Sequence, residues 1–355
     1  MSIIAELAQS NPNILPSSLV PELAGPLDFL RNAGARKLKE GSLAGSSQKI
    51  EIGFLNSRWL SAKSGTYKGV DFVLIGRHNY TILLGFFRAL LSHGIIFPET
   101  ISGIFVDRPV VFPNEIKMIP NMLYDWRDIE ALSDPLRDTL ANNLALGALL
   151  SCFFHEMAHI DNGHTSWIIN NQNASSLSLQ TLEFDADVCA ADEMLRSSLY
   201  PEIDISHSPN RWQLPETNGF GTWKEAVAAV GLISFAQFLW EKGEWSNANE
   251  MLYTAKHPPR ASRISYTIKQ ITHVLNVRCQ MNVVDIEYVL STIVTQLDQT
   301  LNALVPGNTW TSYTEEQEEI GISLFIEYEK EWERLHPELD LLKRKGTLAP
   351  ARAPQ

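Results

Sequence analysis

The feature that most constrains this chain is the segment His155–His159, which reads HEMAH and fits the pattern H-E-x-x-H. On an α-helix, side chains four positions apart share one face, with Cβ atoms roughly 5–6 Å apart. His155 and His159 can therefore direct both imidazoles at one metal ion, and Glu156 can reach a water molecule on that ion. The pattern predicts one catalytic Zn²⁺ with two nitrogen ligands and a general base.

The residues around this motif predict that it lies on a buried helix. Ser133 and Asp134 each offer a cap for the N-terminus of that helix, and Pro135 suits its first turn. The segment Leu136–Ile160 is apolar on nearly all sides, which is typical of a central buried helix, and Asn162-Gly163 supplies a stop. Burying two histidines and a glutamate in such apolar surroundings costs free energy, unless a bound metal ion compensates for it.

A third ligand is expected, because catalytic zinc sites use three protein ligands and keep one position open. His164 is the nearest candidate, but the metzincin pattern places its third histidine one residue later, where Thr165 stands. Another histidine on a distant loop is a further alternative. Glu183 is favoured, because Glu183 and Asp187 share a helix face. Glu183 can then bind zinc while Asp187 accepts a hydrogen bond from Nδ1 of a ligating histidine.

The other polar residues near these motifs are expected to have plainer roles. Asp185 and Asp192 are predicted to be solvated, because they lie on other faces of the second helix. His164 is predicted to be a structural or supporting residue beyond the end of the first helix. Cys152 and Cys189 are expected to be small packing residues.

These residues resemble a known class of enzymes. H-E-x-x-H followed by E-x-x-x-D at Glu183–Asp187 resembles the gluzincin zinc metallopeptidases. The segment Phe154–His164, together with Glu183–Asp187, looks most like the HtpX and CAAX-prenyl-protease group. The resemblance implies a zincin-like catalytic domain, with zinc bound by His155, His159 and Glu183.

A third motif adds to the resemblance. The segment His257–Ile264 reads HPPRASRI, and the same group carries a similar H-P-P-x-x-x-R-I element. The resemblance implies that His257 faces the oxyanion of the reaction or the zinc, and that Arg263 braces the carboxylates or the substrate carbonyl. A plainer interpretation is a proline-terminated loop whose arginine caps a helix or pairs with an acid.

The HtpX group is typically membrane-embedded or exported, whereas this chain is expected to be neither. Its N-terminus lacks the features of a signal peptide, and it has no uninterrupted apolar stretch of about 18 residues. A soluble relative is therefore expected, although peripheral membrane contact stays open. A weaker resemblance is to the Lit-like phage-exclusion proteases.

The cysteine content and the net charge indicate the cellular location and the class of partner to expect. The three cysteines, Cys152, Cys189 and Cys279, form no C-x-x-C pair, so a reducing cytoplasmic location is expected. The formal net charge of −12 argues against nucleic acid as a partner. The expected partner is a protein or peptide substrate, and the sequence leaves the oligomeric state open.

The predicted fold class is α+β and mostly helical, with a small N-terminal sheet beside the central H-E-x-x-H helix. The predicted organisation is an N-terminal arm at 1–48, a metallopeptidase domain at 49–275, a helical extension at 276–342 and a disordered tail at 343–355. A long connection at 199–222 is expected to form a lid or binding loop. Strands are predicted at 49–55, 70–75 and, as a sheet edge that could hold substrate, 101–112. Helices are predicted at 80–92, 136–160, 179–197, 223–241, 282–305 and 315–335.

The activity expected from these motifs is that of a zinc-dependent endopeptidase in which Glu156 acts as general base on a zinc-activated water. Two alternatives remain at this level. One is a catalytically silent zincin-fold module that binds or regulates a partner. The other is a toxin or defence protease that cleaves a single host protein.

Overall fold

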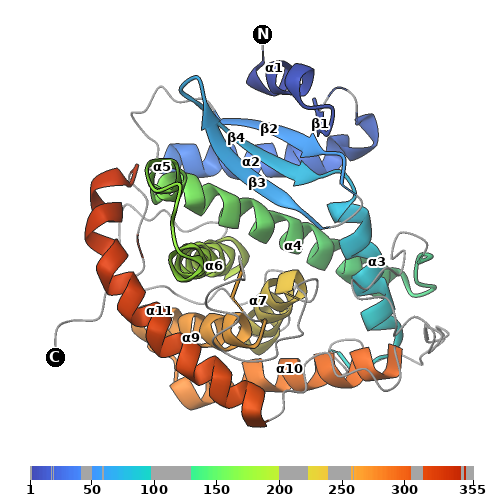
Figure 1. Cartoon of the computed structure of the whole chain (residues 1–355). Helices are drawn as coiled ribbons and strands as arrows, with labels where there is room; N and C mark the ends of the chain where they lie inside the picture. Colours follow the sequence, from blue (N-terminus) through green and yellow to red (C-terminus); the bar gives the residue numbers. More distant parts are fainter. Residues whose placement is uncertain are drawn as a thin grey trace.

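A computed structural model describes residues 2–16, 18, 20–40, 50–57, 60–96, 129–199, 223–238, 257–258, 260–304, 315–344 and 348. Within these ranges the chain is mostly helical and has a small sheet, which confirms the predicted α+β class (Figure 1). The elements are α1 (Ile3–Ser10), β1 (Ile14–Leu15), the 3-10 helix η2 (Pro21–Leu23), α2 (Ala24–Glu40), β2 (Ile50–Leu55), β3 (Ala62–Tyr67), β4 (Val70–Gly76), α3 (Asn79–Ser92), α4 (Pro135–Asp161), α5 (His164–Asn170), α6 (Ser176–Leu199), α7 (Trp223–Phe238), α9 (Arg260–Cys279), α10 (Val283–Leu304) and α11 (Glu315–Leu342).

Helix α4 is the central element, as its apolar sequence predicts. The Asp134 side chain accepts a hydrogen bond from the backbone N–H of Leu136 at 2.9 Å, and Pro135 occupies the first turn. The sheet covers one side of α4, while α6 and α7 pack on the other side (Figure 1). Helix α4, which carries the H-E-x-x-H segment, is therefore covered on two sides by other elements.

The described strands form one four-stranded sheet with the order β1-β2-β4-β3. β2 runs parallel to β4, whereas β1 and β3 are antiparallel to their neighbours. The predicted strands at 49–55 and 70–75 correspond to β2 and β4. β1 comes from the predicted N-terminal arm, and β3, which was not predicted, packs against α4. The predicted edge strand at 101–112 and nearly all of the predicted loop at 199–222 lie outside the described residues.

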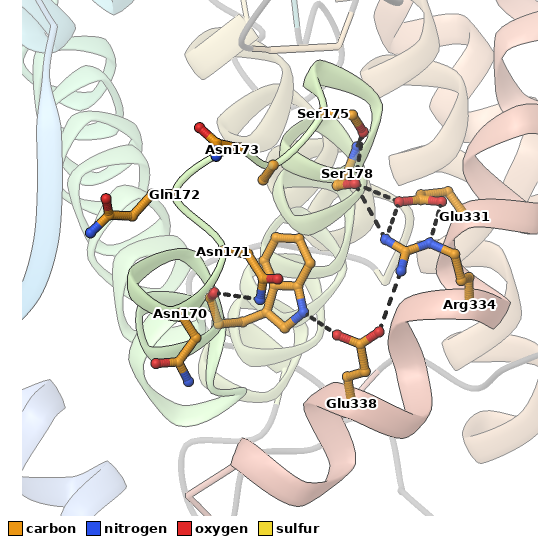
Figure 2. A pocket seen from close by; sticks show the side chains of 11 residues that line it. Asn170, Asn171, Gln172, Asn173, Ser175, Ser178, Glu331, Arg334 and Glu338 are labelled. Carbon is orange, nitrogen blue, oxygen red and sulfur yellow. Dashed lines mark hydrogen bonds and ion pairs between the residues drawn. The ribbon is translucent and has the colours of Figure 1, made fainter.

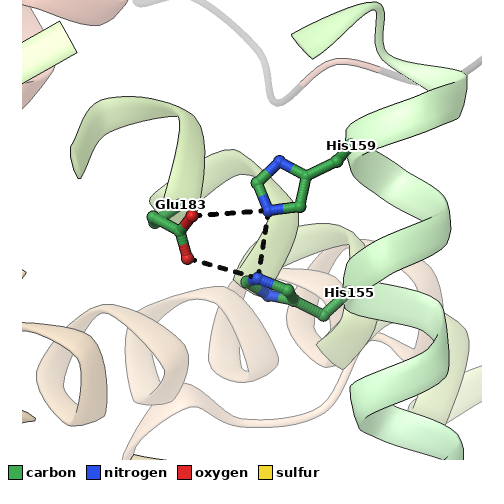
Figure 3. A group of neighbouring side chains, drawn as sticks. All are labelled: His155, His159 and Glu183. Atoms are coloured by element: carbon green, nitrogen blue, oxygen red, sulfur yellow. Dashed lines mark hydrogen bonds and ion pairs between the residues drawn. The ribbon is translucent and has the colours of Figure 1, made fainter. Parts of the chain in front are cut away.

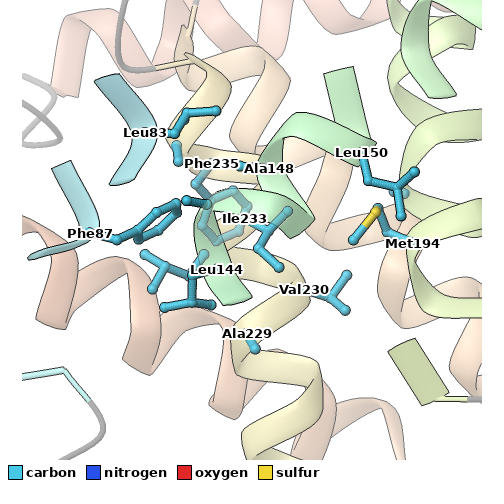
Figure 4. Close-up of a cluster of buried hydrophobic side chains, with 14 of the residues drawn as sticks. Leu83, Phe87, Leu144, Ala148, Leu150, Met194, Ala229, Val230, Ile233 and Phe235 are labelled. Atoms are coloured by element: carbon cyan, nitrogen blue, oxygen red, sulfur yellow. The ribbon is translucent and has the colours of Figure 1, made fainter. Parts of the chain in front are cut away.

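The main apolar core lies around α4 and joins it to α3 and α7 (Figure 4). Phe87 of α3 and Phe235 of α7 are fully buried, and Leu144 of α4 is 1% exposed. Burying side chains of this size stabilises the fold by roughly 1.5–3 kcal/mol each. The core includes residues of α4 from Ala141 to Ile160, so it packs around the turns that carry the H-E-x-x-H segment as well as the N-terminal half of the helix.

Polar contacts join helix α11 to α5 and α6 (Figure 2). Ser178 Oγ donates to Glu331 at 2.5 Å, and Trp167 Nε1 donates to Glu338 at 2.7 Å. Arg334 pairs with both of these glutamates. These side chains line an open, polar pocket of about 530 Å³ that includes none of the residues of the metal motifs.

The residues that follow α11 contact both α4 and the sheet. The backbone N–H of Arg344 donates to the carbonyl of Asp161, the last residue of α4, at 2.6 Å. Its guanidinium Nη1 donates to both carboxylate oxygens of Asp71 in β4, at 2.6 and 2.8 Å. Leu348 is buried against α5, α6 and α11. The predicted domain boundaries, including the tail at 343–355, stay predictions, although these described tail residues lie against the protein.

Gly163 is expected to be intolerant of a side chain. Its φ is +81°, and a Cβ atom there would lie 2.7 Å from the backbone carbonyl carbon of Leu342. We expect Gly163→Ala to lower the free energy of unfolding by about 2–4 kcal/mol, as measured by denaturant titration, because backbone strain and a backbone clash add. Gly69→Ala is the matched control, because Gly69 has φ +75° but no atom within 4 Å of a Cβ. Equal losses in the two variants would show that the contact with Leu342 contributes nothing.

Candidate metal centre and active site

Three side chains converge between α4 and α6 (Figure 3). His155 and His159 project from the same face of α4, and their Nε2 atoms lie 3.1 Å apart. Glu183 of α6 faces them, with Oε2 3.3 Å from Nε2 of His155 and Oε1 3.5 Å from Nε2 of His159. The structure therefore brings together the three residues that the sequence predicted as ligands.

The spacing of these atoms fits a zinc ion. Zn–N and Zn–O bonds of about 2.0–2.2 Å in a tetrahedral site place ligand atoms roughly 3.3–3.5 Å from one another. The two Nε2 atoms lie 3.1 Å apart and are 3.3 and 3.5 Å from the two different carboxylate oxygens of Glu183. With one ligand atom taken from each residue, the three atoms lie within 4.8 Å of one another. Two imidazole nitrogens and a carboxylate are also a donor set that zinc prefers. Among the described residues, His155, His159 and Glu183 are the group of side chains close enough together to hold a metal ion.

On the side of its ring away from Glu183, His155 contacts a buried ion pair formed by Asp187 and Arg263. Its Nδ1 lies 2.9 Å from Oδ1 of Asp187 in α6. Asp187 in turn accepts two hydrogen bonds from Arg263 of α9, at 2.7 Å from Nε and 2.6 Å from Nη2. Burial favours a neutral Asp187, but Arg263 and His155 outweigh it and lower the pKa of this carboxyl group. A bidentate arginine keeps Asp187 ionised, so it is a strong acceptor for His155.

The two histidines have opposite electrostatic surroundings. Burial opposes the charged form of His155, but the carboxylates of Asp187 and Glu183 overcome it and raise its pKa to about 10. Burial lowers the pKa of His159 to about 3, and Glu183 offsets this only in part. Burial also favours a neutral Glu183, yet the histidines lower its pKa well below its usual value. An ionised carboxylate beside two imidazoles favours a bound cation.

Glu156 follows the first histidine and is 8% exposed. Burial raises the pKa of its carboxyl group, although His155 and a hydrogen bond with Ser64 lower it in part. Ser64 belongs to β3, so this strand reaches over α4 at the site. A raised pKa suits a general base, because it strengthens the proton affinity of the carboxylate at neutral pH.

His257 lies at the open side of the cluster. Its Nδ1 is 3.3 Å from Oε2 of Glu183, and its side chain is 56% exposed. The hydrogen bond with Glu183 raises the pKa of His257, and burial offsets part of this rise. His257 is thus placed beside the ligands and accessible to solvent. Arg263, by contrast, is 6% exposed and pairs with Asp187 behind His155.

A second polar network lies behind His159. Its Nδ1 is 3.0 Å from Nδ1 of His164, the first residue of α5. Nε2 of His164 lies 3.1 Å from Oδ2 of Asp185, which also accepts a hydrogen bond from the Asn162 side chain. The prediction that Asp185 is solvated is therefore wrong, because it is 1% exposed and lies against α4 and α5.

Two other sequence expectations can be compared with the structure. Asp192 is partly buried and pairs with Arg196 at 2.6 Å, so it is not simply solvated. Cys152 lies one turn before Glu156, and burial raises the pKa of its thiol to about 12. A thiol of this kind is not a thiolate ligand, which agrees with its expected packing role.

Sequence reasoning missed Ser64 and Asn162 as neighbours of the site. The sequence of β3, AKSGTY, has few apolar residues and no clear alternation, so the sequence held no usable strand signal there. Asn162 was recognised as part of a helix stop. Its side-chain amide also donates to Cys189 at 3.2 Å, and only the position of α6 brings these groups together.

No helix within the described ranges combines the length and the apolar character needed to cross a membrane.

Part of the chain matches the model of a known protein family. Residues 116–276, somewhat less than half of the chain, match the model described as Peptidase U49. Searches of curated proteins and of solved structures gave no match. The matched stretch includes all seven residues that the sequence predicted for the site. The match supports a protease function for the part of this chain that carries the cluster of His155, His159 and Glu183.

Proposed function

We propose that this protein is a zinc-dependent endopeptidase. The observation that carries the proposal is the cluster of His155, His159 and Glu183, which offers one ligand atom from each residue within 4.8 Å of one another. Glu156 lies next to the first ligand, and the Peptidase U49 match covers the same residues. In this proposal His155, His159 and Glu183 bind zinc, and Asp187 orients His155.

Each remaining residue has a role that follows from its position. A bound zinc ion would lower the pKa of a coordinated water from 15.7 to about 7 and would polarise the scissile carbonyl. Glu156 accepts a proton from the attacking water and delivers it to the leaving nitrogen. His257 donates to the carbonyl oxygen from the exposed side of the cluster. Arg263 acts through Asp187, since its guanidinium is buried behind the ligands.

The proposed substrate is a protein or peptide, as expected for a peptidase. We place the reaction in the cytoplasm, because the three isolated cysteines of the sequence suit a reducing compartment. A narrow-specificity protease acting on one host protein shares this chemistry and differs only in the range of substrates.

Metal analysis combined with a search for cleavage products tests the proposal. We expect the wild-type protein to contain bound zinc and Glu183→Ala to lose most of it, because two histidines alone bind zinc weakly. Glu193→Ala, also on α6, is the matched control and should keep its zinc. Incubation with a proteome should give new N-termini with the wild type and none with Glu156→Gln.

Two results would contradict the proposal. A correctly folded wild type that binds no zinc would remove the metal site. A zinc-loaded wild type that generates no new N-termini in varied proteomes would favour the binding or regulatory module instead.

A further inference from the structure

The two proposed histidine ligands are supported in different ways. His155 contacts a carboxylate directly, through Asp187. His159 contacts a second imidazole, that of His164, and Asp185 lies on the far side of that ring. We propose that His164 and Asp185 are positioning residues that fix the ring of His159 for metal binding. This inference rests on the proposed zinc site.

The donor and acceptor roles in this network follow from the atoms that face each other. If Nε2 of His159 binds zinc, its Nδ1 carries the hydrogen and must donate. Nδ1 of His164, 3.0 Å away, must then accept, so the hydrogen of His164 is on Nε2. That Nε2 faces Oδ2 of Asp185 at 3.1 Å, which is an acceptor. The tautomer of His164 with its hydrogen on Nε2 presents an acceptor to His159 and a donor to Asp185.

The local fold places His164 where this network needs it. Gly163, with φ +81°, turns the chain between α4 and α5. His164 then begins α5 directly after the turn, and its ring packs edge-on against His159 with centroids 5.1 Å apart. Asn162, on the other side of the turn, donates to Asp185. The segment Asn162–His164 thus supplies both the second ring and an anchor for the carboxylate.

Burial makes this arrangement more than a surface contact. His164 is 0% exposed and Asp185 is 1% exposed, so water does not compete for the 3.1 Å contact between them. Loss of a buried partner leaves the remaining group unsatisfied. Outer partners of metal-binding histidines typically contribute 10–100-fold to metal affinity. Along α6, Glu183 faces the metal position, Asp187 supports His155 and Asp185 supports His159.

A purely structural role is the competing explanation, in which His164 and Asp185 only tie α5 to α6. The variants His164→Gln and His164→Leu distinguish this structural role from the proposed positioning role. A glutamine amide carries an acceptor and a donor at nearly the spacing of the imidazole nitrogens, whereas leucine carries neither. His273→Leu is the matched control, because it removes an exposed imidazole in the C-terminal half of α9.

Zinc affinity is measured by chelator competition on the full chain, with thermal unfolding as a check on folding. We expect His164→Leu to weaken zinc binding by about 10–100-fold. We expect His164→Gln to recover most of the affinity, and His273→Leu to bind like the wild type. With Co²⁺ as the probe, the absorption spectrum of the bound ion should change in His164→Leu and return toward that of the wild type in His164→Gln.

A measurement on the wild type keeps the inference testable if His164→Leu does not fold. Proton–nitrogen NMR spectra of zinc-loaded protein with labelled histidine should show the hydrogen of His159 on Nδ1 and that of His164 on Nε2. A hydrogen on Nδ1 of His164 would overturn the inference, as would unchanged zinc affinity in a folded His164→Leu variant. A wild type that binds no zinc would instead overturn the proposed function, so the two failures are distinguishable.

Discussion

Glu156→Gln is expected to lower kcat by about 10²–10⁴-fold, the usual contribution of a general base. Glutamine has nearly the same shape but cannot accept the proton of the attacking water. Zinc content should stay at the wild-type level, because the group of possible ligands consists of His155, His159 and Glu183 and does not include Glu156. The measurement is kcat on a cleaved substrate, with zinc determined on the same samples.

The pH dependence gives an independent check on this role. Burial raises the pKa of Glu156, and a base must be deprotonated to act. Wild-type kcat/KM should therefore fall as pH decreases through this raised pKa, and Glu156→Gln should lack that dependence. Glu287→Gln on the exposed face of α10 is the matched control and should behave like the wild type. Cleavage at the wild-type rate by zinc-loaded Glu156→Gln would show that another group takes the proton.

Arg344→Leu is expected to reduce the free energy of unfolding by about 3–5 kcal/mol, the cost of breaking a buried ion pair. Its partner, the Asp71 carboxylate, is 0% exposed in β4 and, among the described residues, would keep the side-chain hydrogen bond from Thr66. Arg344 is 24% exposed, so Asp71→Leu should cost less, because the freed guanidinium can turn toward water. Chemical denaturation of the single variants measures both effects.

Neighbouring residues provide the controls for Arg344. Lys343→Leu removes a more exposed pair with Asp340 and should change stability by no more than about 1 kcal/mol. The double variant with leucine at 71 and 344 should recover part of the loss, because no buried charge remains. If Arg344→Leu and Lys343→Leu have equal effects, the pair with Asp71 does not stabilise the sheet.

Much of the architecture could be predicted because it depends on local patterns. The apolar run of α4, its cap at Asp134 and the stop at Gly163 are each encoded within a few residues. The amphipathic spacing of α10 is likewise local, and its predicted range agrees with the structure. The beginning of α9 at Arg260 was less evident, since the prolines before it suggested a loop. A helix beginning there places Arg263 in its first turn, within reach of Asp187.

The sequence by itself determined that His155 and His159 share a face of a buried helix and that Glu183 and Asp187 share a face of another. The helical period fixes these relations within one turn of chain. Only the tertiary structure decided that α6 crosses α4 at the height of the histidines and that Asp185 turns inward to His164. It also decided that β3 brings Ser64 to Glu156. These contacts depend on how separate apolar faces pack together, which local spacing does not specify.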